Sequence, residues 1–283
     1  MTDLMKDFTA IDEVALGQLR EAERGSEGVK LPFPVLNTWV YNGRAANKRD
    51  AQTAPLLYFG GWATDDGELG KLVQSGDVPS DLDKWVAFED TGKKGNTWGG
   101  RGTRYITAAF IASRARWINS DGSKAGPQYD EAKGLKRQHK HYLTLLYINA
   151  KPWAYAVLSA KGYQTSEIDN SIKAWAAAIA PHRAALNATA LPLSAFALTI
   201  GTFGPEPHYK EVGKGTNKSI ITPMEAGLLP DSAEKVAQRF ITAPLMRQNN
   251  ERLTAAADWL AAWGKAATAA QPADEPEETE IPF

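Results

Sequence analysis

Apolar residues between positions 31 and 160 recur in short runs, and polar or glycine-rich segments separate these runs. Short runs that are rich in β-branched and aromatic side chains, and that turn residues bound, are typical of strands. The pattern predicts strands over residues 35–41, 55–64, 84–88, 104–117, 141–148 and 153–159. The pair Gly60–Gly61 inside the second run indicates a bulge or a sharp bend, and the sequence NAKP at 149–152 predicts a tight turn.

A helical period replaces this pattern after residue 165. Apolar residues recur every three or four positions over residues 167–180, which predicts a helix that Thr165 or Ser166 caps. The glycine-rich segment 91–103 and the polar segment 119–134 are expected to be loops. Further expected elements are strands over 194–203 and 218–222 and helices over 231–241 and 245–263, with Asp231 or Ser232 capping the first of these helices.

Several strands, one helix, one or two further strands and terminal helices thus follow one another along the chain. A small β-barrel interrupted by a helix satisfies this order, and that is the architecture of the oligonucleotide-binding (OB) fold. We expect a mainly β protein with added helices: an OB-fold-like five-stranded barrel with long loops, C-terminal helices and a disordered acidic tail. The expected boundaries are an N-terminal arm at 1–30, an OB-like domain at 31–225, helices packed on the barrel at 226–265 and the tail at 266–283.

Composition excludes several classes of site and of location. The absence of cysteine excludes disulfide scaffolds, thiolate metal sites and cysteine nucleophiles. No uninterrupted apolar run approaches the ~18 residues that a membrane-spanning helix needs. The first residues, MTDLMKDFTAIDE, carry charges where a secretory signal would need an apolar stretch. We therefore expect a protein of the cytoplasm, without a membrane partner.

The formal net charge of −1 hides an uneven distribution of charge along the chain. Residues 93–140 contain eleven basic and three acidic residues, whereas residues 272–283 contain five acidic residues and no basic one. A basic middle and a separate acidic end are typical of a protein that binds a polyanion.

Aromatic residues are interleaved with the basic residues of the middle segment. Proteins that bind single strands place cationic side chains along the phosphates and stack bases on aromatic faces without reading sequence. Arg114 and Arg116 alternate along an expected strand, so both can point to one face. Trp62 also fits a core position, because it lies within a strand pattern. The candidate nucleic-acid-binding residues are Trp62, Lys93, Lys94, Trp98, Arg101, Arg104, Tyr105, Arg114, Arg116, Trp117, Lys136, Arg137 and Lys140.

The C-terminal sequence DEPEETEIPF joins a run of acids to an apolar end. The Phe283 ring can fill an apolar pocket, its carboxylate can meet a basic side chain, and the acids steer the segment toward basic surfaces. This sequence resembles the C-terminal tip of bacterial single-stranded DNA-binding proteins (SSBs), which ends in acids followed by Ile-Pro-Phe. The residues that carry the resemblance, and that are expected to bind partners, are Asp274, Glu275, Glu277, Glu278, Glu280, Ile281, Pro282 and Phe283.

The resemblance implies a sequence-independent protein that coats and protects single-stranded DNA in replication and recombination. In that family the tip recruits replication, repair and recombination enzymes, and it competes with DNA for the protein's own basic groove. The body departs from the cellular SSBs, because it is longer, has helices after residue 230 and lacks a Gly/Gln-rich linker. It looks more like a divergent SSB of the kind that bacteriophages or mobile elements carry, at work in the cytoplasm or nucleoid of a bacterial host. The tip implies neither a homotetramer nor wrapping of DNA, so homo-oligomerisation stays open.

Two other functions share part of this pattern, and a partner-binding or glycan-binding module without salt-sensitive affinity for DNA is a further alternative. A single-strand annealing or recombination protein needs the same charge, and a metal-dependent nuclease would use acids such as Asp65, Asp66 and Glu68. His139 and His141 lack further metal ligands at a suitable spacing, and no phosphate loop or Ser/His/Asp set has the required spacing. We therefore expect a protein that is not an enzyme and that needs neither metal nor cofactor.

Overall fold

A computed structural model gives the positions of residues 33–43, 57–65, 68–69, 71–72, 86–91, 97–120, 122–204, 210–212, 219–221 and 223–263. The expected arm at 1–30 and the expected tail at 266–283 lie outside these described residues. None of the helices in this part of the chain combines the length and the apolar composition that crossing a bilayer requires.

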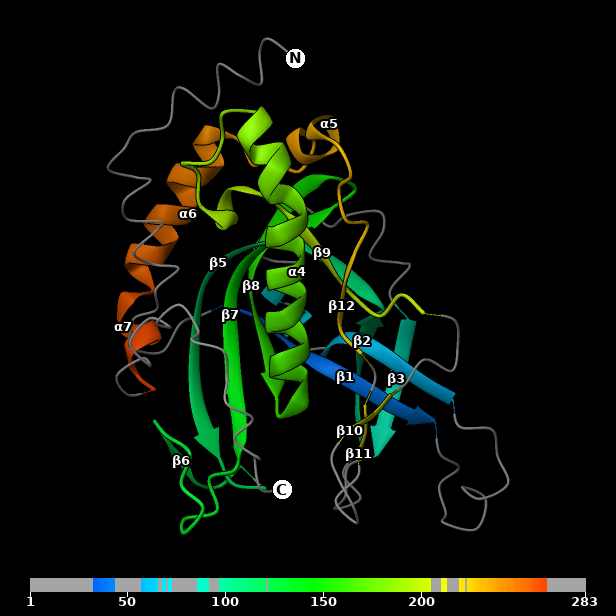
Figure 1. Cartoon of the computed structure of the whole chain (residues 1–283). Coiled ribbons are helices and arrows are strands. Elements are labelled where there is room, and N and C mark those ends of the chain that lie inside the picture. Colours follow the sequence, from blue (N-terminus) through cyan, green and yellow to red (C-terminus); the bar gives the residue numbers. More distant parts are fainter. Residues whose placement is uncertain are drawn as a thin grey trace.

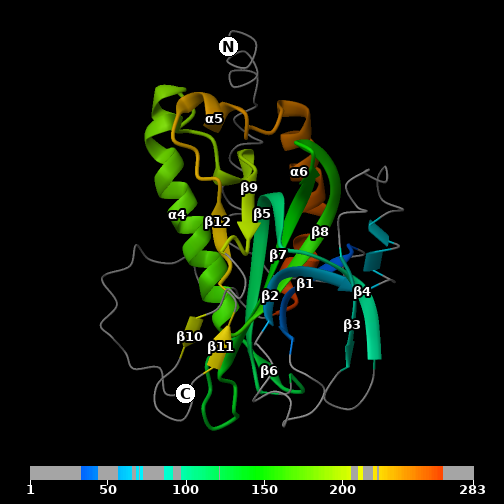
Figure 2. The same cartoon turned by 90° about the vertical axis from the view of Figure 1, so that its right-hand side faces the viewer.

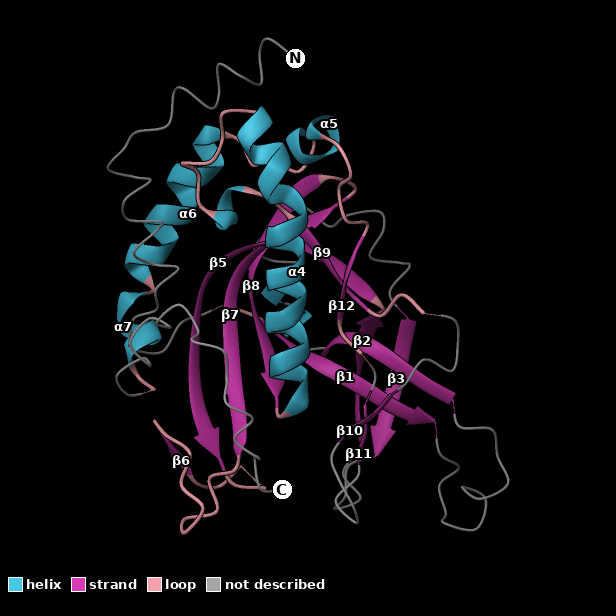
Figure 3. Ribbon diagram, viewed as in Figure 1, coloured by secondary structure: helices cyan, strands magenta, loops and turns pink. Residues whose placement is uncertain are grey.

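Most of the strands belong to one curled, mixed sheet that forms a half-barrel (Figures 1 and 3). The sheet is ten-stranded, with the order β12-β9-β5-β7-β8-β1-β2-β4-β3 and with β6 paired to β5, while β10 and β11 form a separate two-stranded ladder. β1 runs parallel to β8, and the other paired strands are antiparallel. The strands are β1 (Val35–Gly43), β2 (Leu57–Asp65), β3 (Val86–Thr91), β4 (Thr97–Thr103), β5 (Tyr105–Ile118), β6 (Ala125–Gly126), β7 (Arg137–Ile148), β8 (Lys151–Lys161), β9 (Leu198–Gly201), β10 (Lys210–Val212), β11 (Ser219–Ile221) and β12 (Glu225–Gly227).

The mainly β architecture confirms the coarse expectation from the sequence. The six strands expected before residue 160 correspond to β1, β2, β3, β5, β7 and β8. The expected loop at 91–103 is wrong in its second half, because β4 occupies 97–103 and pairs with both β2 and β3. Pairing on two sides outweighs the weak strand preference of a glycine-rich segment. The sheet also contains more strands than the five of the expected barrel.

Gly61 does not form a bulge, which is one of the two expectations for the Gly60–Gly61 pair. The pairing of β2 with β1 runs through Gly60 and Gly61 without a shift of register. Gly61 instead has a φ of 147°, and a Cβ atom there would overlap the backbone of Thr103 and Arg104. The glycine is therefore needed because β2 passes close to the junction between β4 and β5.

The meander β5–β7–β8 supplies the longest strands and much of the core. Asn149 and Ala150 join β7 to β8 with φ angles of 51° and 59°, and Ile148 pairs with Lys151 across them. Two residues of positive φ are the turn that fits the twist of an antiparallel hairpin. The expected tight turn at NAKP is therefore confirmed.

Helices cover both sides of this meander (Figures 1 and 2). They are α4 (Tyr163–Ala185), the 3-10 turn η3 (Leu193–Ala195), α5 (Ala233–Ala237), α6 (Ala243–Ala255) and α7 (Ala257–Ala261). α4 begins after Gly162 and not at the expected caps Thr165 or Ser166. The cap at Ser232 is confirmed, because its hydroxyl accepts a hydrogen bond from the Lys235 amide. The helix expected over 245–263 is divided at Ala256 into α6 and α7.

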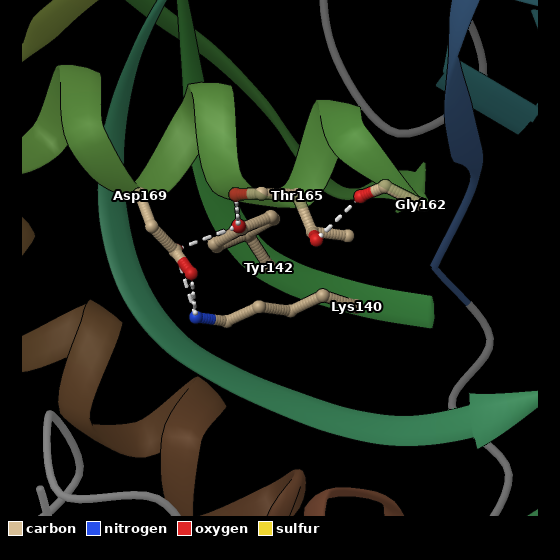
Figure 4. A network of polar contacts seen from close by, with 5 residues as sticks. All are labelled: Lys140, Tyr142, Gly162, Thr165 and Asp169. Atoms are coloured by element: carbon tan, nitrogen blue, oxygen red, sulfur yellow. Dashed lines mark hydrogen bonds and ion pairs between the residues drawn. The ribbon is translucent and has the colours of Figure 1, made fainter. Parts of the chain in front are cut away.

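A polar network fixes the N-terminal half of α4 on the sheet (Figure 4). Lys140 of β7 lies 2.8 and 3.0 Å from the two carboxylate oxygens of Asp169, and the Tyr142 hydroxyl donates to the same carboxylate at 2.8 Å. Thr165 donates its hydroxyl to the Gly162 carbonyl oxygen. Burial, with the Asp169 charge, raises the pKa of Tyr142 well above its ordinary value, so it remains a donor. This network determines which side of β7 faces α4.

Candidate nucleic-acid interface

Neighbouring residues of β7 point to opposite sides of the sheet, which gives the sheet two distinct faces. Lys140 and Tyr142 contact α4, whereas His139 and His141 contact Trp259 and Trp263 at the C-terminal end of the described chain. We call the first side the α4 face and the second side the α7 face.

Basic side chains of three strands meet on the α7 face. Arg114 and Arg116 of β5 lie opposite His141 and His139 of β7, and His139 lies opposite Lys161 of β8. Because residues opposite each other in an antiparallel pair share a face, these side chains lie on one side of the sheet. Arg137, two residues before His139, shares that side. We call Arg114, Arg116, Arg137 and Lys161 the basic cluster.

The members of the basic cluster differ in their partners from the other expected basic residues. Within the described part of the chain, none of the four forms an ion pair; the Arg137 guanidinium donates to the Ser120 carbonyl oxygen at 3.2 Å. Lys136, by contrast, pairs with Glu131, and Lys140 pairs with Asp169 on the α4 face. The structure thus separates two residues that the sequence placed with the cluster.

Burial and mutual repulsion lower the pKa values of cations in the cluster. Burial, and then the charge of Arg116, lowers the pKa of Arg114 to about 10. Burial, followed by the charges of Arg137 and Arg116, also lowers the pKa of Lys161. A face on which positive charges destabilise one another is stabilised by an anion that binds between them.

Two tryptophans pack against the arginines of this face. The Arg114 Cζ atom lies 3.8 Å from the ring centroid of Trp259 and 4.1 Å from that of Trp263. The Arg116 Cζ atom lies 4.3 Å from the Trp263 centroid. These distances are those of cation–π contacts. The Arg114 Nη1 group also donates to the Trp259 carbonyl oxygen at 2.5 Å, which joins α7 to β5.

His139 and His141 complete the cluster as neutral side chains. Arg114 approaches the Nδ1 atom of His141 with Nε at 3.4 Å and Nη2 at 3.2 Å. An arginine can only donate, so this nitrogen accepts and the proton of His141 is on Nε2. Burial, together with the surrounding cations, lowers the pKa of His139 to about 3, and burial together with His139 and the arginines lowers that of His141 to about 2.

A second surface with aromatic rings lies at the other end of β5. Tyr105 is 54% exposed and stacks on Phe203, which is 36% exposed, with ring centroids 5.5 Å apart and an angle of 19° between the planes. Gly227 lies under the Phe203 ring, because a Cβ atom there would overlap the ring, and a Cβ atom at Gly201 would overlap the Arg104 carbonyl oxygen and the Cα atom of Tyr105. Arg104 donates to the Gly204 carbonyl oxygen at 2.6 Å, which holds the Phe203 segment beside β5.

Tyr105 shares the α7 face with the basic cluster. The register between β5 and β7 shifts between Phe110 and Ala112, where β5 contains an extra residue. This bulge moves the odd-numbered side chains before it to the side that the even-numbered ones, such as Arg114, occupy after it. The aromatic pair and the basic cluster are therefore at opposite ends of the same face, roughly 35 Å apart along the strand at ~3.3 Å per residue.

The remaining expected residues have different surroundings. Trp62 is 0% exposed and donates its indole N–H to the Ile200 carbonyl oxygen at 3.0 Å, so its assignment to the nucleic-acid surface is wrong and it is a core residue. Its neighbours along the chain alternate between faces, and the inward position buries the largest ring. Trp117 packs edge-on against Tyr129, with centroids 5.4 Å apart. Arg101 is half-buried on β4. Lys93, Lys94, the Trp98 side chain and the residues of the expected tip, 274–283, lie outside the described part.

Sequence reasoning did not select Lys161, Phe203, Trp259 or Trp263. Trp259 and Trp263 are four residues apart at the end of an expected helix, a spacing that places both on one face. Lys161 is the exposed last residue of β8. Among the described residues, no cluster of three or more His, Cys, Asp or Glu side chains could hold a metal ion. The Nε2 atom of His139 instead lies 3.1 Å from the Ser159 hydroxyl.

Comparisons of this chain with protein-family models, with curated proteins and with solved structures find no match.

Proposed function

We propose that this protein binds single-stranded DNA without sequence preference, and that it coats and protects the strand without catalysing a reaction. The observation that carries the proposal is the basic cluster, in which Arg114, Arg116, Arg137 and Lys161 meet on one sheet face without an ion pair among the described residues. Cations that lack carboxylate partners are available to phosphates. At the other end of the same face, the exposed rings of Tyr105 and Phe203 offer a stacking surface that every base can use.

In this proposal the phosphates follow the basic cluster, and Tyr105 with Phe203 stacks a base farther along the strand. The Tyr105 ring is more than half exposed and is already parallel to its neighbour, so one further ring can extend the stack. Stacking needs no reading of base edges, which fits binding without sequence preference.

The acidic tip supports the second half of the proposal. Residues 274–283 resemble the tip of bacterial SSBs, and we propose that they recruit enzymes of replication, repair or recombination. The finer architecture belongs to the same proposal: an OB-fold-like barrel over 31–225 whose curled sheet and long loops hold the strand, with helices packed on it over 226–265. We propose that the protein is a divergent SSB of a bacteriophage or mobile element, and that it acts in the bacterial cytoplasm.

The test is a titration of the full chain with oligo-dT at several salt concentrations, followed by tryptophan fluorescence. The logarithm of the affinity should fall against the logarithm of the salt concentration, with a slope of about −0.7 for each phosphate that is neutralised. Lys161→Gln should weaken binding and reduce this slope by about 0.7. Lys235→Gln is the matched control, because Lys235 is an exposed lysine on α5 that pairs with Asp231.

Equal behaviour of Lys161→Gln and Lys235→Gln would refute the assignment of the basic cluster. Absence of salt-sensitive binding by the unmodified protein would refute the proposed function as a whole. Pairing of complementary strands, measured in an annealing assay, would identify the annealing alternative, and cleavage that depends on Mg²⁺ would identify a nuclease.

A further inference from the structure

The Trp263 indole occupies a slot in the basic cluster. Its ring centroid is 4.1 Å from the Arg114 Cζ atom and 4.3 Å from the Arg116 Cζ atom. The rings of His141 and His139 lie 4.2 and 4.8 Å from it, tilted by 44° and 45°. Two guanidinium groups and two imidazoles thus surround one flat aromatic ring.

The chemistry of this slot is suited to a nucleobase with its phosphates. A guanidinium plane stacks on a base as it does on an indole, and both imidazoles are neutral and offer ring faces. The Nε atom of Arg116 is buried and has no hydrogen-bond partner among the described residues. The Trp263 indole cannot supply one, because it has no acceptor atom. A base carbonyl or a phosphate oxygen would satisfy this donor. Arg137 and Lys161 provide positive charge beside the slot.

Trp263 lies outside α7 and is less buried than Trp259 and Leu260 of the helix. The helix ends at Ala261, and Trp263 lies two residues beyond it. Trp259 and Leu260 are buried and hold the helix on the sheet, and the hydrogen bond from Arg114 goes to the Trp259 carbonyl oxygen. Trp263 is only half-buried, so it is anchored less firmly than Trp259 and Leu260.

We infer that the slot around Trp263 is a binding site for an unpaired nucleobase, which the protein's own Trp263 ring fills until the strand displaces it. This inference rests on the proposed binding of single-stranded DNA, and it adds that the protein's own ring regulates this binding. The Trp259 ring stays on Arg114 and becomes one wall of the site. The apparent affinity for DNA is then the affinity of the open site multiplied by the fraction of molecules in which Trp263 is out of the slot.

The test compares the full chain with Trp263→Ala and Trp263→Phe in titrations with oligo-dT and with an abasic oligonucleotide of equal length. Trp263→Ala should bind oligo-dT about tenfold more tightly, the gain expected if the ring leaves the slot in about one molecule in ten. Trp263→Phe keeps a ring and should remain closer to the unmodified protein. Binding of the abasic oligonucleotide should change little, because it has no ring to seat. The salt slope should be unchanged, because no cation is removed.

Weaker binding of oligo-dT by Trp263→Ala would overturn the inference, because Trp263 would then be a stacking surface for DNA. Unchanged binding would also overturn it. An equal gain for the abasic oligonucleotide would refute a site for the base. If Trp263→Ala does not fold, Trp263→Leu, which has no ring to stack between the two guanidinium groups, must bind oligo-dT more tightly than Trp263→Phe does. If neither the unmodified protein nor the variants bind, the proposed function itself fails, whereas binding by the unmodified protein without the gain rejects the inference alone.

Discussion

Acidification should destabilise the protein through the two histidines of the α7 face. Burial and neighbouring cations lower the pKa of His139 to about 3 and that of His141 to about 2, from an ordinary value of 6.5. In the unfolded chain both would take up a proton as the pH falls through 6.5, while the folded protein would keep both neutral. Below pH 6.5 the unfolded state therefore binds more protons than the folded state does. The free energy of unfolding begins to fall near pH 6.5 and continues to fall until about pH 3.

The magnitude follows from the same values. Between pH 7 and pH 5 each histidine should lower the free energy of unfolding by about 2 kcal/mol, at ~1.4 kcal/mol per pH unit below 6.5. The pair together should account for about 4 kcal/mol. Both rings remain uncharged in the folded protein over this range, so repulsion between them does not alter the sum.

Urea unfolding at pH 7 and at pH 5, followed by circular dichroism, measures this loss. The double variant His139→Gln, His141→Gln should lose about 4 kcal/mol less between the two pH values than the unmodified protein. His182→Gln, on the C-terminal turn of α4, is the control for the loss of a histidine elsewhere in the protein. Equal losses in the double variant and the unmodified protein would refute the reasoning, whatever their stability at pH 7.

Three further substitutions test single contacts. Tyr105→Ala should weaken binding of oligo-dT by about 1–3 kcal/mol with an unchanged salt slope, since an exposed stacking ring and no charge is lost; a reduced slope would contradict this. Trp62→Phe removes the donor to the buried Ile200 carbonyl and should lower the free energy of unfolding by about 1–3 kcal/mol in urea, and a change within ~0.5 kcal/mol, typical of a surface site, would count against a core role. Tyr142→Phe removes a hydrogen bond to the Asp169 carboxylate and should destabilise by about 1.5–3 kcal/mol, whereas Tyr105→Phe, at an exposed ring, should have little effect on unfolding.

The sequence was sufficient for those features that depend on neighbours along the chain. Alternation and turn residues located the strands around the meander, and NAKP formed the expected tight turn because Asn149 accepts a positive φ more readily than most residues. Ser232 capped α5 because a hydroxyl before a helix reaches the amide three residues on. The local excess of basic residues and the acidic tip are likewise properties of composition.

The basic cluster depended on contacts between segments that are distant in the sequence. One extra residue of β5 near Ile111 reverses which side chains share a face, and strand register brings Lys161 into one row with Arg116, with His139 between them, while it sends Lys140 to the opposite side. The sequence by itself determined that strands, a long helix and a basic middle exist. Only the tertiary structure decided which charges lie together, that Trp62 is buried and that Trp263 lies among the arginines. Periodicity is local, whereas register, bulges and the docking of a distant helix follow from the packing of the whole chain.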